Sequence, residues 1–301
     1  MSANKGVTLS LLSSVLFAVL CYYSVFLSPL NGWQIAAWRA LTTVPLLILL
    51  LALRQELTLF LHYIRSVVKS GRLFAATFIC AALLGLQIVI FCWAPVNGQS
   101  RALALGYFML PLVMVVIGRV LYGEKMTAWQ KSGVLLTACG VTAHVFMVHA
   151  LPVVALVVML GYPPYFIIKR RLKSTHLFSI MAENLLLVTP ALFLLALQAA
   201  DNPVFPAGYV SGWLALSGLG VLSGSALLCF LLASRALSFT LFGMLSYVEP
   251  LLLFIVSLLL PGEKFSPSSL ITYIPIGLAT FALLADGYTK MKRNKSHQRC
   301  S

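Results

Sequence analysis

The chain has 301 residues, of which 60% are hydrophobic and only 9% are charged, with a formal net charge of +14. Soluble domains carry about 45–50% apolar and about 25% charged residues, so this composition excludes a soluble enzyme, a disordered protein and a secreted disulfide scaffold. A polytopic membrane protein remains, and no basic tract interleaved with aromatic residues indicates nucleic-acid binding.

Ten apolar runs have about the length needed to cross a bilayer, whose hydrocarbon core of about 30 Å needs roughly 20 helical residues. The alternating pattern of a membrane barrel is missing, so we expect an all-α integral membrane protein with ten transmembrane helices. In chain order, the expected spans are 7–28, 33–53, 73–94, 102–122, 128–147, 152–168, 177–197, 212–233, 240–260 and 270–288.

The basic residues set the expected orientation, because Lys and Arg collect on the cytoplasmic side of membrane proteins. With the N-terminus inside, 18 of the 21 basic residues fall in cytoplasmic segments, and the tail 289–301 is one of them. We therefore expect both termini on the cytoplasmic side. The 18 residues are Lys5, Arg54, Arg65, Lys69, Arg72, Arg119, Lys125, Lys131, Lys169, Arg170, Arg171, Lys173, Arg235, Lys290, Lys292, Arg293, Lys295 and Arg299.

An internal repeat joins the two halves of the chain. Residues 111–125, PLVMVVIGRVLYGEK, match residues 250–264, PLLLFIVSLLLPGEK, at an offset of 139. The two copies lie five spans apart, and an odd number of spans gives them opposite orientations, as in the inverted repeats of many secondary transporters. We expect two inverted five-helix units, 1–147 and 152–288; the alternative is coincidence between apolar segments.

Three motifs resemble the EamA family of the drug/metabolite transporter superfamily, and its RarD type in particular. They are the run 106–112, GYFMLPL, the YGEK that ends at Lys125, and 246–250, SYVEP. The resemblance implies a ten-helix, five-plus-five carrier in the inner membrane of a bacterium, of a kind that usually exports amino acids, metabolites or drugs. The chain departs from the RarD pattern at 102–105, Leu110, Ser246 and Glu249, where substrate is expected.

Two acidic residues within expected spans are candidates for proton coupling. Glu249 lies about ten residues into its span, where an ionised carboxylate is costly and protonation removes that cost. Glu183 lies about six residues into the seventh span, at the position that Arg39 takes in the second. A structural ion pair or a helix cap is the alternative role for either carboxylate.

Arg39 is the basic residue expected within a span, and its guanidinium suits a substrate carboxylate or phosphate. Snorkelling, or a structural pair with Glu183 or Glu249, is the alternative. Other candidates for substrate contact are aromatic or hydrogen-bonding, a mixture typical of small-molecule pockets, although simple packing is the alternative for each. They are Gln87, Tyr107, Phe108, Tyr165, Ser246 and Tyr247.

Four prolines are expected to kink or hinge their spans, since proline lacks the N–H of a regular helix. They are Pro111, Pro163, Pro164 and Pro250, and the pair 163–164 is expected to interrupt the sixth span. The eighth span, 212–233, is rich in glycine and serine, which favours close contact with neighbouring helices.

The sequence as a whole predicts a secondary carrier with no cofactor, since no ATP-binding, catalytic or metal-binding motif is present. Its expected partners are a small-molecule substrate, the lipid bilayer and, through Glu249, a proton. A facilitator without proton coupling is the alternative within transport. An integral-membrane lipid enzyme and a non-transporting scaffold are the alternatives from other classes.

Overall fold

The structure is a computed structural model, and every element in its described part is a helix. It describes residues 3–27, 29–123, 127–148, 152–172, 176–199, 209–237, 245–260, 274–275, 277–279 and 281–282. The helices are α1 (Ala3–Val25), α2 (Gly32–Leu53), α3 (Leu57–Lys69), α4 (Gly71–Val96), α5 (Ser100–Tyr122), α6 (Ala128–Val148), α7 (Val153–Arg171), α8 (His176–Gln198), α9 (Tyr209–Ala236) and α11 (Val248–Leu259).

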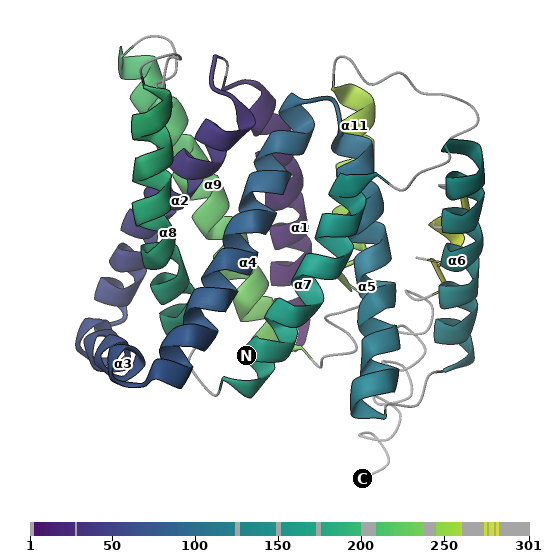
Figure 1. Cartoon of the computed structure of the whole chain (residues 1–301), viewed down its shortest axis with the longest axis horizontal. Coiled ribbons are helices and arrows are strands. Elements are labelled where there is room, and N and C mark those ends of the chain that lie inside the picture. Colours follow the sequence, from purple (N-terminus) through teal and green to yellow (C-terminus); the bar gives the residue numbers. More distant parts are fainter. Residues whose placement is uncertain are drawn as a thin grey trace.

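The long helices run side by side and alternate in direction, as expected for a chain that crosses a bilayer repeatedly (Figure 1). Within the described residues, six segments are long and apolar enough to cross a membrane, and Val153–Lys169 and Val248–Leu259 are shorter apolar helices. The six are Lys5–Val25, Gly32–Leu53, Gly71–Val96, Ser100–Leu121, Leu177–Gln198 and Ser211–Phe230.

Nine of the ten expected spans contain a described helix. The tenth, 270–288, lies mostly outside the described residues. The tail 289–301 lies wholly outside them, and so do Glu124 and Lys125 of the first repeated loop and residues 262–264 of the second. One helix was not expected: α3 follows α2 directly and lies at the end of the bundle where α4 begins (Figure 1).

Small residues bring helix α9 against α1 and α2. A Cβ atom at Gly220 would lie 2.6 Å from the carbonyl oxygen of Thr42 on α2, so the two backbones pack without room for a side chain. On the α1 side, Tyr23 donates a hydrogen bond of 2.9 Å to the carbonyl oxygen of Ala215, next to Gly218. Close packing of the small-residue segment is therefore confirmed, as is usual where lipid tails are as apolar as the helices.

The two halves of the chain interleave. Helix α1 packs on α9 and α11 from the second half, and α7 packs on α4 and α5 from the first half. At Gly106 on α5, a Cβ atom would lie 2.9 Å from the carbonyl oxygen of Ala155 on α7, so this contact is also backbone to backbone.

The expected interruption at Pro163–Pro164 is wrong. Helix α7 continues from Val153 to Arg171 with both prolines inside it. Proline has a helical φ, and its cost is the missing N–H and a clash with the preceding turn. Membrane helices tolerate that cost because neighbouring groups satisfy the freed carbonyls.

Substitution of Gly220 by Ala should destabilise the bundle by about 1–3 kcal/mol, because the new methyl group meets backbone atoms of α2. Gly71→Ala is the matched control, since a Cβ atom there has no neighbour within 4 Å. Thermal unfolding of the two purified variants in detergent measures the difference, and equal melting temperatures would contradict the close packing of α9 on α2.

Candidate functional site

Arg39 is buried in the middle of the bundle. Helix α2 begins with a capping box, in which the Asn31 side chain accepts hydrogen bonds from backbone N–H groups of the first turn. The Gln34 side chain in turn accepts a hydrogen bond from the backbone N–H of Asn31. Seven residues into the helix, the Arg39 guanidinium donates from Nε to Ser223 Oγ of α9 at 2.9 Å and lies over the ring of Phe91 from α4, 5.0 Å from its centroid. Arg39 is only 7% exposed.

Glu249 lies near Arg39 but is not paired with it. It occupies the first turn of α11, just after the turn at Ser246 and Tyr247, and is 8% exposed. The carboxylate interacts electrostatically with Arg39, yet among the described residues no ion pair within 4.0 Å joins the two, and none donates a hydrogen bond to Glu249. A helix N-terminus favours a negative charge, which makes this position tolerable for a carboxylate.

Two tyrosines line the same region. Tyr107 of α5 and Tyr162 of α7 share a hydrogen bond of 3.0 Å between their hydroxyl groups, and Glu249 interacts electrostatically with both. Phe91 packs against Tyr107 with a centroid distance of 6.1 Å. Arg39, Phe91, Tyr107, Tyr162 and Glu249 together form what we call the central cluster.

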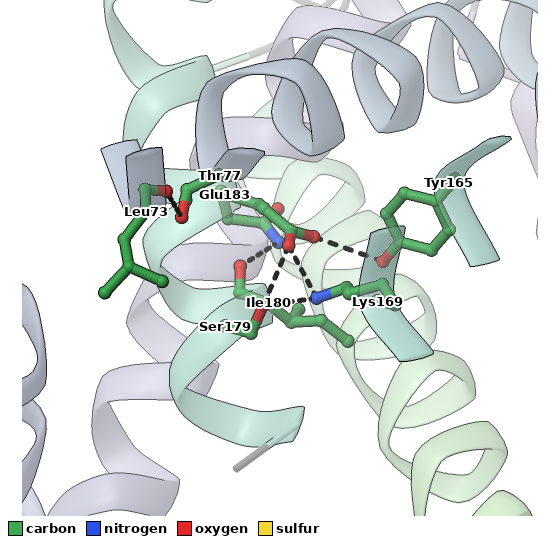
Figure 2. Close-up of polar contacts among 8 residues, drawn as sticks. Leu73, Thr77, Tyr165, Lys169, Ser179, Ile180 and Glu183 are labelled. Carbon is green, nitrogen blue, oxygen red and sulfur yellow. Dashed lines mark hydrogen bonds and ion pairs between the residues drawn. The ribbon is translucent and has the colours of Figure 1, made fainter. Parts of the chain in front are cut away.

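A second polar group, the Glu183 cluster, lies between α7 and α8 (Figure 2). Lys169 of α7 forms an ion pair with Glu183 of α8 at 2.5 Å, and Ser179 donates to the same carboxylate oxygen at 2.9 Å. Tyr165 donates to the other oxygen at 3.1 Å, and its ring lies 5.4 Å from the Lys169 ammonium. Glu183 is fully buried, and each of its carboxylate oxygens accepts a hydrogen bond from a neighbouring side chain.

Stacked rings connect the two clusters. Tyr162 of the central cluster stacks on Phe166 with a centroid distance of 5.8 Å, and Phe166 contacts Tyr165 of the Glu183 cluster at 5.5 Å. Tyr107 and Tyr162 are 5.8 Å apart, so the rings continue from Phe91 to Tyr165 without a gap. These five rings, Phe91, Tyr107, Tyr162, Phe166 and Tyr165, form the aromatic row.

One of the sequence-based alternatives is corrected here. Glu183 pairs with Lys169 and not with Arg39. Lys169, which was assigned to a cytoplasmic segment, reaches from the last turns of α7 into the bundle and has a side chain only 9% exposed. A basic residue near a span end is normally free to reach the membrane surface, so the sequence alone does not indicate that Lys169 turns inward.

The remaining candidates contact residues outside the central cluster. Gln87 of α4 donates to the carbonyl oxygen of Val157 on α7 at 2.9 Å and lies against Gly161. Phe108 packs with Leu105, Met109 and Ala155, whereas Tyr247 packs with Leu112 and Val134. The buried hydroxyl group of Tyr247 forms no hydrogen bond with any residue in the described part of the chain. Of the residues expected to flank the prolines, Tyr107 thus lies in the central cluster, whereas Phe108 and Tyr247 lie in two other apolar clusters.

The prolines differ in their surroundings. Pro250 is buried in the first turn of α11, where a backbone N–H has no partner within the helix, so its missing N–H costs no helical hydrogen bond. The backbone of Pro111 is part of α5, which continues through it to Tyr122.

Sequence reasoning missed Phe91 and Tyr162 as members of the site. Tyr162 is adjacent to the proline pair that drew attention to this segment, but its orientation toward Tyr107 depends on how α5 and α7 pack. In the described part of the chain, no three His, Cys, Asp or Glu residues are grouped closely enough to hold a metal ion.

Comparisons with known proteins agree on the class of this chain. No protein-family model matches it. The chloramphenicol-sensitive protein RarD of Pseudomonas aeruginosa is 41% identical over 278 residues, which is 92% of each chain. An uncharacterized transporter of Haemophilus influenzae is 34% identical over 95% of each chain, and protein RarD of Escherichia coli is 24% identical over 97% of this chain and 98% of its own.

A solved crystal structure has the same fold. Its sequence is 17% identical, and it superposes with a TM-score of 0.62 over 94% of this chain and 98% of its own.

Lys169→Met should destabilise the protein by about 3–5 kcal/mol, because it leaves the Glu183 carboxylate buried without its cation. The double variant Lys169→Met/Glu183→Leu removes both charges and should recover part of the lost stability. Thermal unfolding of the purified proteins measures both effects. A double variant less stable than Lys169→Met alone would contradict the buried pair.

Proposed function

Since this chain belongs to the RarD-like drug/metabolite transporter family, we propose that it is a secondary carrier that exports small metabolites, amino acids or drugs across the bacterial inner membrane. The observation that carries the proposal is the central cluster. Arg39 and Glu249 are a basic and an acidic residue buried near each other, and among the described residues no ion pair joins them. Buried charges are normally paired, so this arrangement suits a site whose partner arrives with the substrate.

The geometry of the central cluster supports a site for an amphipathic solute. Arg39 offers a guanidinium for an anionic or polar group, while Phe91, Tyr107 and Tyr162 offer apolar ring surface beside it. The aromatic row continues this surface toward the Glu183 cluster. Small-molecule sites combine a few polar groups with an apolar lining in this way.

We further propose that the two halves, 1–147 and 152–288, are inverted five-helix repeats of a ten-helix bundle, followed by the basic tail 289–301. At the offset of 139, α4 corresponds to residues 210–235, and α9 spans Tyr209–Ala236. The packing supports the same relation, because the contact of α1 with α9 has its counterpart in that of α7 with α4. Likewise, α1 on α11 corresponds to α7 on α5.

This symmetry gives the carrier a route to alternating access. Arg39 and Glu183 each lie seven residues after the first residue of their helices, α2 and α8, which begin at opposite ends of the bundle (Figure 1). We propose that the central cluster is reached from one side of the membrane at a time, with movement at Pro111, Pro163, Pro164 and Pro250. The Glu183 cluster, already saturated with hydrogen bonds, is more suited to closing a path than to binding solute. The role of the Glu183 carboxylate in proton coupling stays a prediction.

The substitution Glu249→Gln tests whether transport is coupled to proton movement. The amide cannot release a proton, so solute-driven proton flux in everted vesicles should fall below about a tenth of the wild-type value, and the pH dependence of transport should disappear. Glu56→Gln, at the start of α3, is the control and should leave both unchanged. The transported solute is taken from a screen of metabolites and drugs in the same vesicles. Unchanged transport and pH dependence in Glu249→Gln would indicate a facilitator driven by the solute gradient.

Placement of the two GEK loops tests the inverted repeat. We expect tags inserted at Lys125 and Lys264 to be accessible from opposite sides of the inner membrane, with Lys125 on the cytoplasmic side, because five spans separate them. Labelling of intact cells and of everted vesicles with a membrane-impermeant reagent distinguishes the two sides. Accessibility of both tags from one side would exclude the inverted arrangement.

A further inference from the structure

The unexpected helix α3 is fixed to the end of the bundle by one of its faces. Phe60 and Val67 are buried against the core, and Phe60 packs on Phe178 of α8 with a centroid distance of 5.9 Å. Tyr63 contacts the same ring at 5.9 Å. The helix lies across the ends of the vertical helices in Figure 1, between the end of α2 and the start of α4.

A second face of α3 is apolar but is covered by nothing in the described structure. Leu57, Leu61 and Val68 are 41%, 53% and 68% exposed. At about 100° per residue they fall within about 40° of one another, directly beside the buried face. Helix α3 joins α2 and α4, which are both long and apolar enough to cross a membrane, so this stripe lies at the ends of two candidate spans.

The next face around the helix is cationic. Arg65 and Lys69 are one turn apart and exposed, and Arg54 and Arg72 lie just beyond the two ends of the helix. Glu56 is the single acidic residue in 54–72. Among the described residues, none of these four cations forms an ion pair.

We infer that α3 lies in the plane of the membrane surface, with the stripe of Leu57, Leu61 and Val68 in the lipid and the basic residues bound to headgroups of anionic phospholipid. The order of the three faces around the helix is the one that such a position requires: protein, then acyl chain, then headgroup. Charge complementarity favours lipid over a second copy of this chain, because a symmetric dimer through α3 would bring the same cations together.

The test counts bound lipid on the full chain. The purified protein in neutral detergent is titrated with phosphatidylglycerol or with phosphatidylcholine, and bound lipid is counted by native mass spectrometry. The wild type should prefer phosphatidylglycerol, and Arg65→Gln/Lys69→Gln should lower that preference about tenfold or more, since each basic residue near an anionic surface contributes attraction. Lys131→Gln/Arg171→Gln removes the same charge from exposed positions outside α3 and should retain the preference.

The apolar stripe is tested separately with Leu61→Ser/Val68→Ser, which should lower retention of both lipids while the ratio between them stays as in the wild type. Three results would overturn the inference: equal binding of both lipids by the wild type, an unchanged preference in Arg65→Gln/Lys69→Gln, or equal losses in the two charge variants. A fourth is an apolar variant that alters the oligomer mass and leaves lipid retention unchanged. None of these measurements requires transport, so they are independent of the proposed carrier function.

Discussion

Close approach of helix backbones at glycine positions determines where the functional groups of this protein lie. In a bilayer, burying apolar surface between helices gives no hydrophobic stabilisation, because the lipid tails are equally apolar. Helix packing therefore depends on close contact at small residues. Gly32 brings α2 against Trp93 of α4, and Gly220 brings α9 against Thr42 on the other side of α2. Arg39 is thereby held between Phe91 and Ser223, which come from those two neighbouring helices.

Two buried residues of opposite charge, Glu183 and Arg39, differ in how completely neighbouring groups pair with them. Glu183 has a cation and two hydroxyl donors, and nothing further is needed to balance it. Arg39 contacts a serine hydroxyl, the face of an aromatic ring and a sulfur atom 4.0 Å away, and none of the described residues forms an ion pair with it. A buried charged group with a full set of ion-pair and hydrogen-bond partners adds rigidity, whereas one without a counter-ion is available to a ligand.

The sequence was sufficient for features that depend on composition and length. It predicted the helical class, a helix within nine of the ten expected ranges and the close packing of 212–233, and six of the described segments are long and apolar enough to cross a membrane. It did not predict α3, whose 13 residues are too few for a span and were read as a charged connector. It also missed the partners of Glu183 and the contact of Tyr162 with Tyr107, since these depend on how helices distant in sequence rotate against each other.

Interleaving of the halves has a consequence for biogenesis. The hydroxyl group of Tyr23 in α1 bonds to Ala215 in α9, so its acceptor is synthesised 192 residues later. Until α9 has entered the membrane, the side of α1 that will meet it faces lipid or an insertion factor. Tertiary assembly of the N-terminal helices therefore waits for late translation, although each helix can form as soon as it is inserted.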